Sequence, residues 1–153
     1  MKFGWINGFG AIIIVLIMIP NIIYTIKNKG EKNLCDNKFM NIIEQIGRYT
    51  SIIFMWLPLL VWEFGFKNVS EMIIYFIGNI GLLIAYIIIF SLYLKKKTRR
   101  KAIALAIIPS CIFIMSGILL RHLLLLVSGV IFSIGHIYVT IKNNEENYES
   151  KTN

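Results

Sequence analysis

The sequence predicts an all-α integral membrane protein, a bundle of five transmembrane helices. Hydrophobic residues make up 57% of the 153-residue chain and charged residues 16%, whereas soluble domains have roughly 45–50% apolar and about 25% charged residues. The apolar residues form long continuous runs, and such runs exclude a transmembrane β-barrel, whose strands alternate apolar and polar residues. A helix of about 20 residues spans the hydrocarbon core of a bilayer, so each run is long enough to cross it.

Short polar connectors separate the predicted helices. Only Arg121 and His122 lie between the last two apolar runs, so these runs are expected to form a helical hairpin. Ser70 and Glu71 are residue types that favour a helix N-terminus, and they precede the third run. The helices are predicted at residues 5–26, 42–66, 72–94, 102–120 and 123–141, in a single domain of residues 1–141, with a polar tail at 142–153 that frays into solvent. Three prolines, Pro20, Pro58 and Pro109, fall inside these helices and are expected to kink them.

A dense run of basic residues orients the bundle. Cytoplasmic loops of membrane proteins are enriched in Lys and Arg, and the first connector, this run and the tail together hold twelve basic residues against three at the other ends. We therefore predict an outside N-terminus and a cytoplasmic C-terminus, in a multi-pass protein of the bacterial cytoplasmic (plasma) membrane. The formal net charge of +8 is expected to attract anionic lipid headgroups rather than nucleic acid. The residues of this topology anchor are Lys95, Lys96, Lys97, Arg99, Arg100 and Lys101.

Polar residues of three predicted helices lie at one depth near the cytoplasmic boundary. A rise of about 1.5 Å per residue places them within roughly 10 Å of that boundary. An ionisable group at membrane depth suggests a functional site, because the loss of its water is costly unless it is paired or hydrated. Two interpretations stay open: a self-paired cluster of Glu44 and Arg48, four residues apart, or a binding vestibule facing the cytoplasm. The candidate ligand-binding residues are Asn21, Tyr24, Glu44, Arg48 and His136.

A second set of polar residues is predicted at the outer side, where Glu63, Arg121 and His122 form a charged cluster, best explained as a solvated ion pair. The two histidines, His122 and His136, are fourteen residues apart in one helix, or roughly 20 Å. They therefore cannot ligate one metal ion or one haem iron. The sequence carries no motif of a hydrolase, zinc protease or nucleotide-binding enzyme, and we predict no metal, no cofactor and no catalytic residue.

Four short segments together resemble an uncharacterised family of small five-helix integral membrane proteins of low-GC bacteria. These segments are IPNIIY at 19–24, NIIEQIGRY at 41–49, GILLRH at 117–122 and GHIY at 135–138. The resemblance implies a five-helix membrane architecture over nearly the whole chain, and it brings no activity that can be transferred.

Three functions are compatible with these patterns. The first is a non-catalytic accessory, regulatory or immunity-type membrane component that acts through helix contacts with a membrane-protein partner or a second copy. The second is a binder or transporter of a small solute or lipid that uses the cytoplasm-facing polar layer. The third is a membrane-embedded enzyme, which would have to rely on His136 and Glu44.

Overall fold

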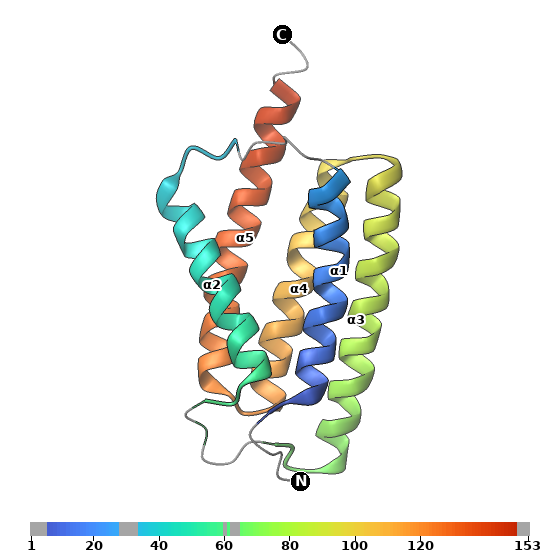
Figure 1. Ribbon diagram of the computed structural model, residues 1–153, viewed down its shortest axis with the longest axis vertical. Helices are drawn as coiled ribbons and strands as arrows, with labels where there is room; N and C mark the ends of the chain where they lie inside the picture. The colour runs from blue at the N-terminus through green and yellow to red at the C-terminus, as the bar shows by residue number, and fades with distance from the viewer. Residues whose placement is uncertain (1–5, 28–33, 60, 62–64, 150–153) are drawn as a thin grey trace.

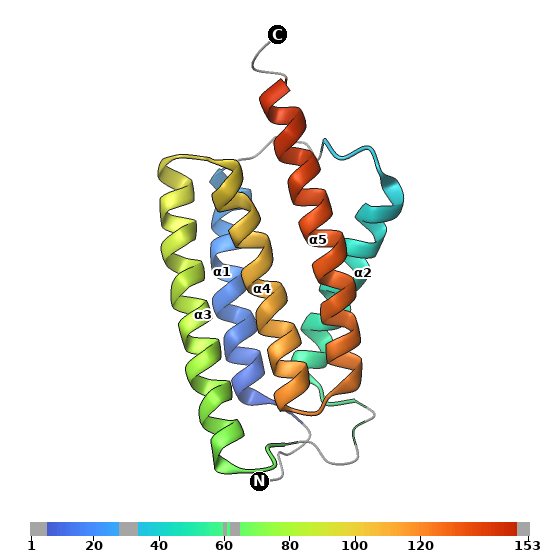
Figure 2. The same cartoon turned by 180° about the vertical axis from the view of Figure 1, so that it is seen from behind.

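Five helices make up the chain in the computed structural model, which describes residues 6–27, 34–59, 61 and 65–149. They are α1 (Gly8–Lys27), α2 (Lys38–Trp56), α3 (Val69–Lys95), α4 (Arg99–Leu119) and α5 (Leu123–Glu149). Successive helices run in opposite directions, so the end of α1, the start of α2, the α3–α4 loop and the end of α5 lie at one end of the bundle (Figures 1 and 2). We call it the basic end, because the α3–α4 loop carries Lys95 to Lys101. The predicted all-α, five-helix fold is confirmed.

Four of the helices in the described part of the chain are long and apolar enough to cross a membrane: α1, α3, α4, and α5 as far as Glu145. The prediction of five transmembrane helices is therefore supported for these four and not for α2. Charged and amide residues interrupt the apolar sequence of α2, among them Asn41, Glu44, Gln45 and Arg48. The side of the membrane that each end faces stays a prediction.

The second helix is shifted relative to the predicted range of 42–66. It begins at Lys38, because the side chain of Asn37 accepts a hydrogen bond from Met40 N, 3.1 Å away, and caps the first turn. It ends at Trp56, because Leu57 is extended and the ring of the following Pro58 disfavours a helical residue before it. The prediction of a proline kink at Pro58 was therefore wrong, whereas Pro20 and Pro109 do lie inside helices.

The third helix begins one residue after Asn68, which caps it in place of the predicted Ser70. The side-chain oxygen of Asn68 accepts from Glu71 N at 2.8 Å, and the Glu71 carboxylate accepts from Lys67 N at 2.7 Å. The first bond satisfies a backbone donor in the first turn of the helix, and the second ties the residue before the cap to that turn. Ser70 lies inside the helix, one residue after its start at Val69.

The fifth helix continues to Glu149, so the prediction that the chain frays from Lys142 was wrong. Its last turns are held by neighbours at the basic end. Asn143 Oδ1 accepts from the backbone N–H groups of Leu34 and Cys35 at 2.8 and 2.9 Å. Glu145 forms an ion pair of 2.8 Å with Arg99 at the start of α4. These contacts tie a polar helix end to two other segments of the bundle.

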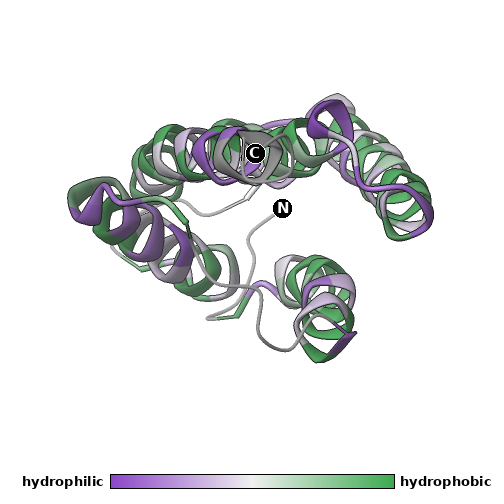
Figure 3. Ribbon diagram, turned by 90° about the horizontal axis from the view of Figure 1, so that it is seen from above, coloured by the Kyte–Doolittle hydropathy of each residue, from purple (hydrophilic) through white to green (hydrophobic). Residues whose placement is uncertain are grey.

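The helices pack in the order α2, α5, α4, α3, and α1 lies against α2 and α3. Seen from the basic end, the first four form an arc and α1 lies across its open side (Figure 3). All five helices contribute to one apolar core, for example through Ile14, Met55, Leu83, Ile112 and Phe132. Contacts between α1 and α2 lie at the opposite end, where Asn7 N donates to Trp56 O at 2.9 Å. Toward the basic end the two helices diverge (Figures 1 and 3).

Candidate functional site

The carboxylate of Glu44 lies at the centre of a charged cluster between α2 and α5. Glu44 is buried, and its Oε1 atom pairs with the guanidinium of Arg48, one turn further along α2. The same oxygen is 2.8 Å from His136 Nδ1 on α5. One buried acceptor therefore binds two donors, one from its own helix and one from the neighbouring helix.

Two glycines allow α2 and α5 to approach closely enough for this pairing. A Cβ atom on Gly135 would lie 2.6 Å from Glu44 N, and one on Gly47 would lie 2.5 Å from Phe132 N. One or two turns further, Ser51 Oγ donates to Ser128 Oγ at 3.2 Å. Small residues that let two backbones meet, with a hydroxyl pair between them, are typical of helix packing in membranes.

Exposure differs sharply within the charged cluster. The side chain of Glu44 is 6% exposed, whereas those of Arg48 and His136 are 38% and 22% exposed. The imidazole of His136 stacks on Phe132, with ring centroids 4.7 Å apart, which fixes the plane of the ring. The acceptor is thus enclosed by the protein, and the two donors lie on its more open side.

An electrostatic interaction links Arg48 to the Tyr86 hydroxyl on α3. That hydroxyl donates to Asn21 Oδ1 on α1 at 3.3 Å. Asn21 and Tyr86 thus form a hydrogen-bonded pair on α1 and α3, and Tyr86 interacts with Arg48 of the charged cluster. Tyr24 is the exception among the predicted residues, because its ring lies 6.0 Å from that of Tyr93 and beneath the ammonium group of Lys97.

Two members of the predicted outer charged cluster, Arg121 and His122, lie at the turn between α4 and α5, and the cluster itself stays a prediction. His122 is buried, its Nδ1 accepts from Leu125 N at 3.1 Å, and it therefore caps the N-terminus of α5. Burial lowers the pKa of His122, which favours the neutral imidazole. Arg121 is exposed and adopts a positive φ of 54° in the turn between α4 and α5. Glu63, the third predicted member, lies outside the described residues.

The six basic residues of the predicted topology anchor have two kinds of environment. Lys101 Nζ donates to the carbonyl oxygens of Leu92 and Lys96 at 2.9 and 3.1 Å, and thereby closes the end of α3. Arg99 and Lys97 also contact other helices, through Glu145 and Tyr24. The remaining three, Lys95, Lys96 and Arg100, are exposed. The loop therefore contacts α1, α3 and α5, and it also exposes positive charge at the basic end.

A second polar cluster, which the sequence did not reveal as a unit, lies toward the opposite end. Its members are 0–1% exposed and come from α3, α4 and the residue before α1. Asn79 Nδ2 donates to Tyr75 O at 2.9 Å, and Ser116 Oγ donates to Asn79 Oδ1 at 3.4 Å. Asn7 Nδ2 donates to Met55 O at 3.1 Å. We call Asn7, Tyr75, Asn79 and Ser116 the neutral cluster, because all four side chains are uncharged.

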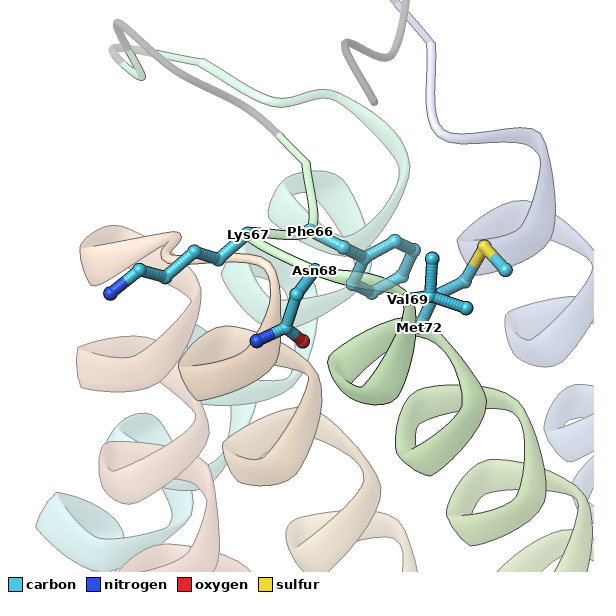
Figure 4. Close-up of a pocket in the computed structure, with 5 residues that line it drawn as sticks. All are labelled: Phe66, Lys67, Asn68, Val69 and Met72. Carbon is cyan, nitrogen blue, oxygen red and sulfur yellow. The ribbon is translucent and has the colours of Figure 1, made fainter.

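A small pocket of about 150 Å³ lies at the start of α3 (Figure 4). Phe66, Lys67, Asn68, Val69 and Met72 line it, and the long side chain of Lys67 extends away from the ring of Phe66 (Figure 4). Ligand pockets usually measure roughly 300–1,000 Å³, and this one is formed by a single stretch of chain around a helix cap. Within the described residues, no group of three or more His, Cys, Asp or Glu side chains is arranged to hold a metal ion.

Comparisons of the chain with protein-family models, with curated proteins and with solved structures give no match. The fold and composition define the class of protein, a five-helix protein with four candidate membrane spans. The predicted resemblance to a bacterial family stays a prediction.

Proposed function

We propose that the chain is a non-catalytic integral membrane protein that binds an anionic group at the basic end, with Arg48 as its main contact. The observation that carries this proposal is the layering of the charged cluster. Its one negative group, Glu44, is enclosed beneath two donors that are 38% and 22% exposed. A ligand that approaches the cluster therefore meets the guanidinium N–H groups of Arg48 before the carboxylate of Glu44.

The chemistry of Arg48 suits an anion. A guanidinium has five N–H donors and binds a carboxylate, phosphate or sulfate in a forked geometry. Arg48 Nη2 is the nitrogen that donates to Glu44, so the guanidinium keeps further donors. The ligand would also meet Asn21 and the Tyr86 hydroxyl, which are hydrogen-bonded to each other.

The surroundings favour the approach of negative charge. Lys95, Lys96 and Arg100 are exposed at the same end of the bundle, and like-signed charge around a site raises the local concentration of its counter-ion. The helices α1 and α2 also diverge toward this end (Figures 1 and 3). In a cell, the ligand is an anionic lipid headgroup or a soluble anion on the side of the membrane that the basic end faces.

The test uses the full chain in phosphatidylcholine nanodiscs, with thermal unfolding as the readout. Low-millimolar sulfate is the soluble probe, and discs that contain phosphatidylglycerol supply the lipid probe. We expect at least one probe to raise the unfolding midpoint of the wild type and of Arg100→Gln, an exposed arginine at the same end. The effect is expected to disappear in Arg48→Gln and to persist in part in Arg48→Lys.

The two probes separate a lipid from a soluble ligand, and the Arg100→Gln control separates the cluster from the general positive surface. An equal midpoint shift in Arg48→Gln and wild type would refute the proposal, as would the absence of a shift with both probes. Arg48→Lys keeps the positive charge and removes the forked donor geometry of the guanidinium. A partial midpoint shift in this variant would show that the missing shift in Arg48→Gln reflects lost donors rather than lost folding.

Action through helix contacts with a membrane-protein partner or a second copy stays a prediction. Only 22% of the apolar stretch is buried inside the chain in each of α1 and α3, so both helices present long apolar faces. Lipid tails cover such faces as well as a partner helix does.

A further inference from the structure

With His136 neutral, the charged cluster is electrically balanced before any ligand arrives. Glu44 contributes one negative charge, Arg48 one positive charge, and a neutral His136 none. An anion placed beside this cluster adds a negative charge to a site in which Glu44 is almost fully enclosed. An uncompensated charge in such surroundings is costly.

His136 is the group of the cluster that can supply the missing positive charge. Its Nδ1 faces the Glu44 carboxylate at 2.8 Å, and an ionised carboxylate only accepts hydrogen bonds. The hydrogen of a neutral His136 therefore lies on Nδ1, and an added proton goes to Nε2. Histidine is the side chain that ordinarily changes its charge between about pH 5 and 8.

The neighbouring helices offer few other titratable groups to His136. α5 packs against α2 and α4, and α2 presents Glu44 and Arg48. Within α4 the titratable residues are Arg99, Arg100 and Lys101 in its first turn and Cys111, which is exposed. Tyr86 of α3 lies on the Arg48 side of the cluster. Among the described residues, Glu44 is thus the titratable group shown in direct contact with the imidazole.

We propose that the site binds an anion together with one proton, which His136 takes up from water on its Nε2 atom. Neutral His136, a proton and the anion combine into an imidazolium–anion pair next to the Glu44–Arg48 pair. For a singly charged anion, such as the phosphatidylglycerol headgroup, the bound state is then electrically balanced; for sulfate, the proton offsets one of its two negative charges. This inference rests on the proposed anion site and adds its coupling to pH. Glu44 remains ionised and holds both cations in place.

The coupling predicts how affinity varies with pH. As the pH rises, the association constant falls by up to about tenfold for each pH unit, because binding must add one proton. The sulfate ion and the phosphatidylglycerol headgroup keep a constant charge between about pH 6 and 8. Any pH dependence of the association constant in this interval therefore arises from the protein.

The experiment measures the dissociation constant of whichever probe binds, in nanodiscs, at several pH values in this interval. We expect the wild type to bind more tightly at the acid end, by about tenfold or more. His136→Asn retains an amide donor in place of Nδ1 toward Glu44, and we expect it to bind as weakly at the acid end as the wild type does at the alkaline end. The variant thereby separates loss of the proton from loss of the contact with Glu44.

Each outcome decides one question. No binding of either probe to the wild type at any pH refutes the anion site itself. Binding that is independent of pH in the wild type leaves the anion site intact and overturns the proton coupling. A pH dependence that survives in His136→Asn and disappears in Glu44→Gln assigns the proton to Glu44 and overturns the role of His136.

Discussion

Two polar clusters lie inside the bundle, and they differ in charge and in exposure. The charged cluster joins α2 to α5 toward the basic end, and its arginine side chain is 38% exposed. The neutral cluster joins Asn7, α3 and α4 toward the other end, and its members are 0–1% exposed. Amides and hydroxyls can be enclosed completely when they bond to one another, whereas an enclosed charge needs a partner and is costly even then.

The comparison separates a structural role from a binding role. The neutral cluster leaves no side chain accessible to a ligand, so its hydrogen bonds serve to hold helices together. The charged cluster holds α2 to α5 through Glu44 and still leaves the side chains of Arg48 and His136 partly accessible. A variant that disturbs the neutral cluster should therefore change stability alone, and one that removes Arg48 should change both stability and the response to a ligand.

The largest effect is expected where the α2–α5 seam is tightest. Gly135→Ala places a methyl group 2.6 Å from Glu44 N, and a backbone atom cannot move aside as a flexible side chain can. We expect a loss of about 3 kcal/mol in the free energy of unfolding, measured by SDS titration, and weaker probe binding, because α2 is pushed away from His136.

Gly81→Ala is the matched control for this prediction. No atom lies within 4 Å of the added methyl group, and alanine favours a helix over glycine, so the stability of α3 should be unchanged or raised. Equal losses in Gly135→Ala and Gly81→Ala would mean that the close approach of α2 and α5 does not matter for stability.

Part of the charged cluster was predictable from the sequence, for a definite reason. Glu44 and Arg48 are one turn apart, and the distance of His136 from the end of its predicted helix placed it at the same depth. The structure brings these three together. The order in which helices pack was not predictable, because chain connectivity does not say that α2 lies against α5. For the same reason Tyr24, at the correct depth, faces Tyr93 and Lys97 instead.

The C-terminal end of α2 shows that the length of an apolar run did not predict the length of the helix. The apolar run continues past Trp56, and its length suggested a full transmembrane helix to Phe66. Pro58 nevertheless ends the helix through its effect on Leu57. The neutral cluster was missed because Asn7 precedes its helix and Ser116 lies in an apolar helix. No periodic pattern of polar residues therefore connects either of them with Tyr75 and Asn79.

A smaller effect is expected from Asn7, which links the neutral cluster to α2. Asn7 accepts from Gly10 N and donates to Met55 O, both at 3.1 Å. Asn7→Ala removes a helix cap and leaves a buried carbonyl without this donor, so we expect a loss of about 2 kcal/mol. Asn37→Ala removes an exposed cap of α2 and should cost about 1 kcal/mol or less. A cost for Asn7→Ala no greater than that of its control would show that the bond to Met55 contributes nothing.

The smallest effect is expected from Tyr75→Phe. The Tyr75 hydroxyl is buried, and no group among the described residues lies at hydrogen-bonding geometry to it, although Asn7 and Ser116 are close. Removal of a buried polar atom without a partner is nearly neutral or stabilising, so we expect a change within about 0.5 kcal/mol. Tyr86→Phe is the control, because it removes the hydrogen bond of 3.3 Å from the Tyr86 hydroxyl to Asn21, and it should cost about 1 kcal/mol. A loss of that size in Tyr75→Phe would instead mean that the hydroxyl is hydrogen-bonded, for example through water to Asn7 or Ser116, and that the neutral cluster extends across α1, α3 and α4 as one network.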